Sequence, residues 1–435
     1  MSQPPWPLFS PSEIASLTSP PARPRARRPA RAAASEPPPS AVPIIALCHL
    51  GWDWVWQRPQ QFLSRFARTH PVLFVETHCS EVSATRVDLR PADGHANVTI
   101  LQMQLPAARW ADGDYIDAER RRALRATLAG ELRGRFDRPL LWFNDPMAVV
   151  AFAGHLGERA IVYDCMDELS QFKGAPPVLV ERERDLLRRA DVVFCGGQRM
   201  RQKRLPLNSN CHFFGTGVDV AHFGRARTDA LPVAPEIAAF GPGPVLGYFG
   251  VIDERIDYDL LVHIADARPD WHIAMVGPTA KVDPATFPRR PNLHWLGGQP
   301  YARLPELAKG FSVAVMPFAL NAATEFINPT KALEYMAAGR PVVSTALAEV
   351  RLNFGRVARI ADSADEFIEY CAREISRPSW LRISRGLELA AANTWEAIVA
   401  RMEEHIARVL APADTAPRAA ARSLPATGLS NLAYV

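Results

Sequence analysis

The chain has 435 residues, of which 48% are hydrophobic, and its formal net charge is +4. This length indicates two or three domains with ordinary buried cores. Five arginines lie between residues 23 and 31, so the rest of the chain is close to neutral. This charge distribution gives no indication of a nucleic-acid partner.

The six cysteines are scattered and form no CxxC pair, which indicates a reducing compartment and no zinc site. Residues 1–43 contain no apolar signal-peptide core, and no later apolar run is long enough to cross a membrane. We therefore expect a cytoplasmic protein, at most peripheral at the inner face of the membrane.

The two ends of the chain differ in composition from its middle. Residues 1–42 are rich in Pro, Ala and Arg, and residues 411–435 lack periodic apolar positions. Such segments cannot bury enough apolar surface to offset the entropy lost on ordering. We predict that both ends are disordered.

Short apolar runs alternate with amphipathic stretches from Ile44 onward, which is typical of a parallel α/β sheet. The first series predicts a Rossmann-like domain over residues 43–215. Its strand-like runs are IIALC, VLFVE, LLWF, AIVYD and DVVFC.

A Gly- and Pro-rich segment over residues 216–243 has no sustained period and is predicted to be an interdomain linker. A second Rossmann-like domain is expected over residues 244–394. Residues 395–410 have helical periodicity and predict a closing amphipathic helix. The second series of runs is VLGYFG, WHIAMVG, NLHWLG, VAVMP, PVVST and VARIA.

Ligands of open α/β sheets bind beyond the carboxyl ends of the strands. The loop after VAVMP continues into a predicted helix over residues 330–338, with Asn328 as its N-cap, Pro329 at its first position and Gly339 as a left-handed end. Glu334 lies about one turn inside this helix. A carboxylate there can accept hydrogen bonds from two ribose hydroxyls, which suits a nucleoside diphosphate.

Three residues near this helix suit contacts to phosphate. Gly250, after the first strand of the second series, permits close approach of the backbone, and Arg255 and Lys331 supply positive charge. For Arg255 the alternative is a salt bridge to Asp253, Glu254 or Asp257. For Lys331 the alternative is a solvated surface lysine.

The loop after the first strand of the chain faces the same cleft in this prediction. It carries His49, Gly51, Asp53 and Arg58, and Arg58 could instead orient the loop. Trp52, Trp54 and Trp56 could stack on sugar rings or pack an interdomain edge.

Asp164 and Asp167 follow a later strand as a DxxD pair and are predicted to bind a ligand hydroxyl and not a metal. Asn144 and Asp145 are similar acceptor-side candidates. The basic run GGQRMRQKRLPLN is interpreted as one solvated helix face, because it has no interleaved aromatic residues.

The segment EFINPTKALEYMAAGRPVVST resembles the donor-binding signature of the retaining GT-B glycosyltransferases called group 1, or family 4. Other segments agree in order and spacing with a bacterial branch associated with cell-surface polysaccharide synthesis, over roughly residues 44–410. These segments are DWVWQRPQQFLSRFA, YDCMDELSQFKGAP, GVDVAHF, GYFGVIDERIDYDLL and TWEAIVARM.

The resemblance implies a GT-B fold, two tandem Rossmann-like domains with a donor cleft between them. It implies hexosyl-type transfer, with retention, from a UDP- or GDP-type sugar to a saccharide or glycolipid, without a cofactor or an obligatory metal. In the family two glutamates bracket the donor helix. Glu334 matches the ribose-binding one, and Glu325 is the nearest match to the one that touches the donor sugar, although it lies one residue farther away than usual. Asn328 and Thr330 are donor-side residues on this pattern.

Two other functions remain open. A nucleotide-sugar 2-epimerase shares the architecture and the ribose-binding glutamate but needs no acceptor. A catalytically inactive GT-B-like protein that binds a sugar and scaffolds an assembly would be compatible with the displaced Glu325.

Overall fold

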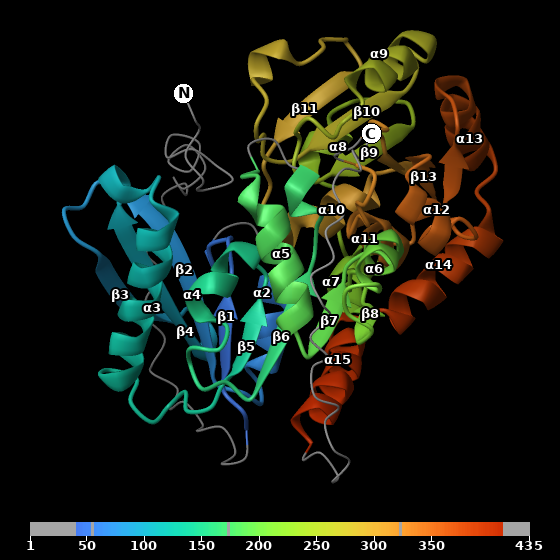
Figure 1. The fold of residues 1–435 in the computed structure, drawn as a ribbon. Coiled ribbons are helices and arrows are strands. Elements are labelled where there is room, and N and C mark those ends of the chain that lie inside the picture. Colours follow the sequence, from blue (N-terminus) through green and yellow to red (C-terminus); the bar gives the residue numbers. More distant parts are fainter. Residues whose placement is uncertain (1–40, 54–55, 172–174, 322–323, 412–435) are drawn as a thin grey trace, which may run out of the picture.

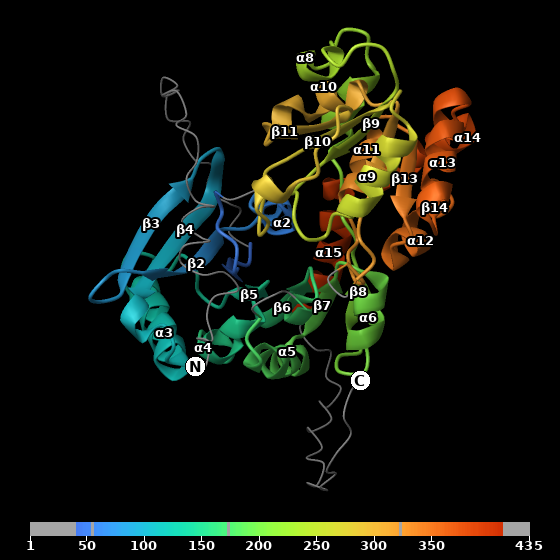
Figure 2. The ribbon, with the colours of Figure 1, turned by 90° about the horizontal axis from the view of Figure 1, so that it is seen from above.

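The structure is a computed structural model that describes residues 41–53, 56–171, 175–321 and 324–411 (Figure 1). Two α/β domains lie side by side, and each is built on its own sheet (Figure 2). The predicted disordered ends, except residues 41, 42 and 411, lie outside the described residues, and so does Trp54.

The N-terminal domain has an eight-stranded sheet in the order β3-β4-β2-β1-β5-β6-β7-β8. All neighbours in it are parallel except the antiparallel pair β3 and β4. Its strands are β1 (Ile44–Leu47), β2 (Val72–Ser80), β3 (Arg86–Ala92), β4 (His95–Pro106), β5 (Leu140–Phe143), β6 (Ala160–Cys165), β7 (Val192–Cys195) and β8 (Cys211–Phe213). Its helices and 3₁₀ turns are α2 (Arg58–Phe66), η1 (Ala107–Arg109), α3 (Gly113–Ala129), η2 (Pro146–Ala148), α4 (Val149–Phe152), η3 (Leu169–Gln171), α5 (Val178–Arg189) and α6 (Gln198–Arg204).

The β3–β4 hairpin is absent from the sequence prediction. It turns at Asp93 and Gly94, where Gly94 has a φ of +76°. An Asp-Gly pair between strand-like runs is a strong hairpin signal, because Gly adopts positive φ at no steric cost. The hairpin lengthens the sheet at the edge away from the second domain (Figure 2).

The C-terminal domain has a fully parallel six-stranded sheet in the order β11-β10-β9-β12-β13-β14. Every strand in it was expected from the sequence. Its strands are β9 (Val245–Phe249), β10 (His272–Val276), β11 (Leu293–Gly297), β12 (Val313–Met316), β13 (Val342–Thr345) and β14 (Arg359–Ala361). Its helices and 3₁₀ turns are α9 (Tyr258–Ala267), η5 (Pro284–Thr286), η6 (Tyr301–Arg303), α10 (Leu304–Lys309), α11 (Lys331–Ala337), α12 (Ala348–Phe354), α13 (Ala364–Ser376) and α14 (Trp380–Ala392).

The segment over residues 216–243 is packed more closely than the linker prediction supposed. It forms α7 (Val220–Gly224), η4 (Arg225–Arg227) and α8 (Pro235–Ala238). Phe223 and Ile237 are buried in the core of the C-terminal domain. The segment therefore belongs structurally to that domain, because its apolar side chains contribute to the domain's core.

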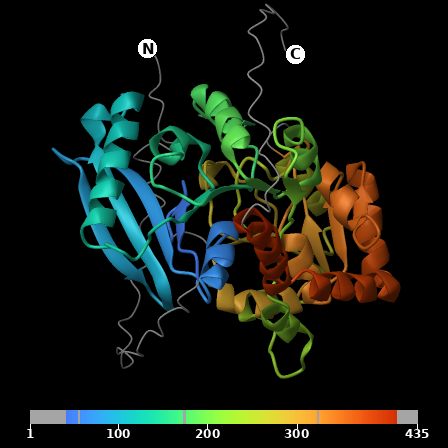
Figure 3. The same cartoon turned by 60° about the horizontal axis from the view of Figure 1, so that its bottom comes forward.

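The closing helix α15 (Trp395–Leu410) returns to the N-terminal domain and packs beside α2 (Figure 3). Trp395, Ile398 and Met402 are buried in that domain's core. The chain passes between the domains twice, near Val218 and near Asn393. These two segments are in contact, because the Val218 N–H donates to the Asn393 carbonyl at 3.0 Å. The expected closing helix is thus present, and it joins the two domains through its packing.

Candidate functional site

Helix α11 begins later than the sequence predicts. Its N-cap is Thr330, whose side chain accepts no capping hydrogen bond. Asn328 is not the N-cap, because its Nδ2 donates to the Gly196 carbonyl of the N-terminal domain at 2.9 Å. Asn328 therefore joins the two domains, and the donor-side roles of Asn328 and Thr330 stay predictions.

The end of α11 agrees with the sequence. Gly339 has a φ of +71°, its N–H donates to the Met336 carbonyl, and the Arg340 N–H donates to the Tyr335 carbonyl. This pair of bonds is the Schellman arrangement. The helix is also fixed to the end of β9, because the Phe249 N–H donates to the Tyr335 hydroxyl at 2.9 Å.

Gly250 follows β9 with a φ of +149° and lies directly against Lys331. A Cβ at residue 250 would be 1.8 Å from Lys331 Cε and 2.9 Å from the Tyr248 hydroxyl. The Lys331 ammonium also lies 5.8 Å from the centre of the Tyr248 ring. Lys331 is thus not a solvated surface lysine, since its side chain packs on the backbone at the end of β9.

Glu334 lies one turn beyond Lys331 and is half-buried. Burial raises the pKa of Glu334 to about 7, although the Lys331 charge acts in the other direction. Burial lowers the pKa of Lys331, and the Glu334 charge opposes that shift. No described residue donates a hydrogen bond to the Glu334 carboxylate, so its oxygens can accept hydrogen bonds from a ligand.

Arg255 pairs with Asp253, the first of the alternatives expected for it. Arg255 Nε lies 2.8 Å from Asp253 Oδ1, and Nη2 lies 2.5 Å from Oδ2. Burial opposes the charge of Arg255, but the hydrogen bonds and charge of Asp253 outweigh burial and raise its pKa. This pair holds a charged guanidinium at the end of β9.

Asp167 of the N-terminal domain faces this cationic group. Burial raises the pKa of Asp167, while the charges of Arg255, His49, Arg58 and Lys281 lower it. Arg255 and Lys281 belong to the C-terminal domain, so charges from both domains act on this carboxylate. Burial also lowers the pKa of His49, and Asp167 opposes that shift.

Arg58 and Asp164 form a buried pair. Asp164 is fully buried, Arg58 Nη2 lies 2.7 Å from Asp164 Oδ1, and Asn144 Nδ2 donates to Asp164 Oδ2 at 3.1 Å. Arg58 also donates to the Phe214 carbonyl at 2.7 Å. These contacts match the alternative in which Arg58 orients its loop, and both oxygens of Asp164 have protein partners.

The other residues after β1 are dispersed. Asp53 is exposed and pairs with Arg90, and the Gly51 carbonyl accepts a hydrogen bond from Gln60 at 2.9 Å. Trp52 is buried and packs edge-on against Phe74 at a centroid distance of 5.2 Å. This geometry favours the packing interpretation of Trp52 over sugar stacking.

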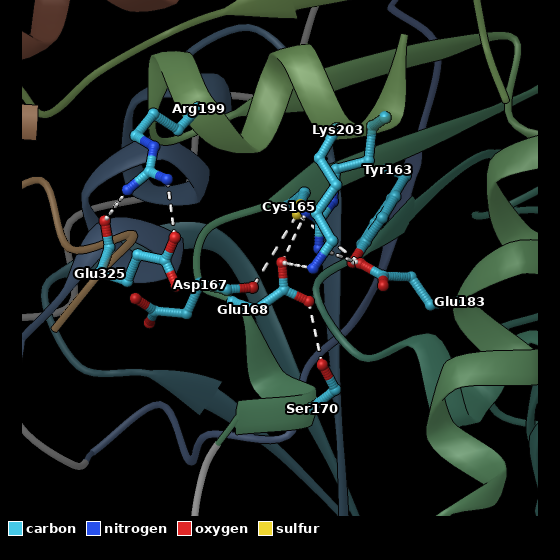
Figure 4. A network of polar contacts seen from close by, with 10 residues as sticks. Tyr163, Cys165, Asp167, Glu168, Ser170, Glu183, Arg199, Lys203 and Glu325 are labelled. Atoms are coloured by element: carbon cyan, nitrogen blue, oxygen red, sulfur yellow. Dashed lines mark hydrogen bonds and ion pairs between the residues drawn. The ribbon is translucent and has the colours of Figure 1, made fainter. Parts of the chain in front are cut away.

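Glu325 pairs with a residue of the N-terminal domain. Its Oε1 lies 2.6 Å from Arg199 Nη2, on helix α6 of the N-terminal domain (Figure 4). The prediction of one solvated face for the basic run that forms α6 agrees with the exposure of Gln202 and Lys203 but is wrong for Arg204. Arg204 is only 2% exposed and Lys203 pairs with Glu168, because carboxylates of neighbouring elements surround the helix.

Glu349 is a functional candidate that the sequence did not reveal. It is fully buried on α12, and its carboxylate accepts the N–H groups of Gln198 at 2.9 Å and Arg199 at 2.6 Å. These donors are about 150 residues away in the sequence. No local sequence pattern indicates such a contact, because it depends on how the two domains pack.

Comparisons with known proteins agree with this geometry. Residues 243–376 match the family described as glycosyl transferases group 1. A Bacillus subtilis protein, named as the teichuronic acid biosynthesis glycosyltransferase TuaH, is 26% identical over 231 residues. That match covers 48% of this chain and 56% of TuaH, so the chain spans little more than half the length of this relative.

Solved structures share the fold over most of the chain. Sucrose-phosphate synthase from Thermosynechococcus elongatus has a TM-score of 0.62 at 15% identity, covering 85% of this chain and 99% of that one. HepE from Anabaena, solved in complex with UDP-glucose, has a TM-score of 0.61 at 14% identity, covering 84% and 100%. Within the described residues no helix combines the length and apolarity that a membrane crossing requires. Residues 243–376 thus match the group 1 glycosyltransferase family, and the chain as a whole has the GT-B fold of these solved structures.

Proposed function

We propose that the protein transfers a sugar from a nucleoside-diphosphate donor to a hydroxyl of a saccharide or lipid-linked saccharide. The observation that carries this proposal is the group of Arg255, Lys331 and Glu334 beyond the carboxyl ends of β9 and β12. Cations there suit a pyrophosphate, and the Glu334 carboxylate one helical turn away, to which no described residue donates a hydrogen bond, suits the two hydroxyls of a ribose.

In this proposal Glu334 binds the ribose and Lys331 and Arg255 bind the phosphates. Gly250 leaves room for the Lys331 side chain at the phosphate position, since any side chain at residue 250 would collide with Lys331. Asp253 holds the Arg255 guanidinium in place before the donor arrives, so the fixed charge needs little reorganisation during the reaction.

The reaction breaks the bond between the anomeric carbon and the diphosphate oxygen and forms a bond from that carbon to the acceptor oxygen. Negative charge grows on the departing diphosphate, where Arg255 and Lys331 stabilise it. The acceptor proton passes to an oxygen of the leaving phosphate, on the same face of the sugar, which retains the anomeric configuration. Asp167 and His49 lie on the acceptor side of this group, and Asp167 orients the attacking hydroxyl.

The donor is a UDP- or GDP-type hexose in this proposal. The fold shared with HepE, which was solved with UDP-glucose, favours UDP. The similarity to TuaH favours an acceptor in cell-surface polysaccharide synthesis. A donor made in the cytoplasm and a lipid-linked acceptor would place the reaction at the inner face of the membrane.

The test incubates purified protein with UDP- and GDP-sugars and with oligosaccharide or lipid extracts, while release of nucleoside diphosphate is followed. We expect release from one donor that an acceptor stimulates. Conversion of the donor sugar without an acceptor would instead identify a 2-epimerase. Binding of a donor without any turnover would identify an inactive scaffold. The pairing of Glu325 with Arg199 is compatible with this alternative, because it engages the glutamate that resembles the donor-sugar residue of the family.

A further inference from the structure

Helix α6 makes contacts with residues of both domains, and Figure 4 shows those of Glu325 and Glu168. Its first backbone N–H groups are bound by the buried Glu349 carboxylate of the C-terminal domain. Asn353 Nδ2 donates to the same carboxylate at 3.1 Å and thereby fixes its orientation. Because Glu349 is fully buried, this contact cannot be exchanged for water without opening the interface.

The segment Glu325–Asn328 of the C-terminal domain docks on the same helix. Glu325 pairs with Arg199, and the Phe326 ring lies 5.2 Å from the Arg199 guanidinium and 5.1 Å from the Lys203 ammonium. Phe326 also packs against the core of the N-terminal domain. Cation–π contacts of this kind add to the ion pair. The segment is thus held by several different contacts.

The last turn of α6 holds the loop that carries Asp167. Arg204 Nη1 lies 2.8 Å from Glu168 Oε2, and Lys203 Nζ lies 3.2 Å from the same oxygen. Ser170 Oγ donates to the other oxygen of Glu168 at 2.9 Å. Glu168 is the neighbour of Asp167 in the chain, so its position limits where the Asp167 carboxylate can lie.

We propose that α6 is a positioning element that couples the docked segment Glu325–Asn328 of the donor side to the Asp167 loop, with Arg199 as its positioning residue. Glu325 acts through Arg199 in this arrangement and does not contact the donor sugar. This inference rests on the proposed sugar transfer. It also gives a structural reason why Glu325 lies one residue farther from Glu334 than in the family. The segment Glu325–Asn328 crosses the domain boundary to reach α6.

The two roles for Glu325 differ in magnitude. An ion pair with both side chains partly exposed contributes at most about 1 kcal/mol, which corresponds to roughly a fivefold change. A carboxylate that acts on the reacting sugar contributes about 10²-fold or more. The size of the effect therefore separates positioning from direct participation in the reaction.

The test is a charge exchange between the two residues. Arg199→Glu and Glu325→Arg are each expected to lower acceptor transfer by roughly two- to fivefold and to raise the ratio of donor hydrolysis to transfer, because Asp167 is less well placed. The double variant is expected to recover most of both losses. Arg188→Glu, an exposed arginine on α5, serves as the matched control and should leave both quantities unchanged.

A loss of about 10²-fold in Glu325→Arg that the double variant does not recover would overturn the proposal, because it would assign Glu325 to the donor sugar. Hydrogen exchange of the peptide over residues 196–204 gives a readout without turnover. We expect faster exchange in each single variant and restored protection in the double variant. Unchanged exchange in the single variants would also overturn the proposal, whereas failure of sugar transfer in the wild type would overturn only the proposed function.

Discussion

Lys331 occupies the space where a side chain at residue 250 would begin, since a Cβ on Gly250 would lie 1.8 Å from Lys331 Cε. Gly250→Ala must therefore displace Lys331, and the φ of +149° adds backbone strain. We expect the affinity for UDP or GDP to fall at least about tenfold. Calorimetric titration measures this change. Gly241→Ala is the matched control, because its φ is +88° but nothing lies within 4 Å of its Cβ.

The affinity for nucleoside diphosphate should depend on pH through Glu334. Its pKa is raised to about 7, so ribose binding to the carboxylate form should strengthen as pH rises from 6 to 8. The change is at most about tenfold per pH unit below the pKa. Glu334→Gln should bind more weakly and flatten this profile. An equally steep profile in the variant would assign the titration to another group.

The raised pKa of Glu334 also makes the stability of the folded protein depend on pH. Because the pKa of Glu334 is higher in the folded protein than its ordinary value of 4.5, its contribution is full below pH 4.5 and is lost as pH rises through about 7. Compared with the wild type, Glu334→Gln should lose less stability over that window. Denaturant unfolding of both proteins at several pH values measures the difference, and parallel curves would contradict the assignment.

Arg255→Ala should lower kcat/KM for sugar transfer by roughly 10²-fold, because it removes a fixed charge near the departing diphosphate. Arg255→Lys should recover only part of this loss, since an ammonium cannot reproduce the two-pronged contact with Asp253. Steady-state kinetics with saturating acceptor test both. Equal activity of Arg255→Lys and wild type would show that charge alone suffices.

Arg58 and Asp164 are predicted to matter for stability. Arg58→Ala leaves the fully buried Asp164 carboxylate without its main partner, which should cost about 3–5 kcal/mol of unfolding free energy. The double variant Arg58→Met/Asp164→Leu should be less destabilised than Arg58→Ala, because it removes both charges. Chemical denaturation compares the two. A stable Arg58→Ala variant with impaired donor binding would instead favour a direct role in the site.

Much of the fold could be predicted from the sequence, because buried parallel strands form continuous apolar runs such as VAVMP and PVVST. The β3–β4 hairpin was missed although Asp93 and Gly94 marked its turn. The sequence predicts a linker over residues 216–243, because the short helices of this segment have too few turns to show a period. Phe223 and Ile237 contribute to the core only through tertiary packing.

Some residues of the candidate site could be predicted from local sequence pattern, and others could not. Gly250, Arg255, Lys331 and Glu334 lie at strand ends and helix starts, so local pattern alone placed them together. Asn328 was predicted to cap a helix, but a carbonyl of the other domain is its partner. Contacts between residues distant in the chain depend on how the domains pack, and a single sequence does not contain that information.

Transfer of a labelled sugar from the nucleotide donor to a supplied acceptor measures the proposed reaction itself. The wild type is compared with Glu334→Gln and with Glu388→Gln, which changes an exposed glutamate on α14. We predict that wild type and Glu388→Gln form labelled acceptor equally well. Glu334→Gln is expected to form at least about tenfold less labelled acceptor. Undiminished transfer by Glu334→Gln, or no labelled acceptor with any donor, would contradict the account.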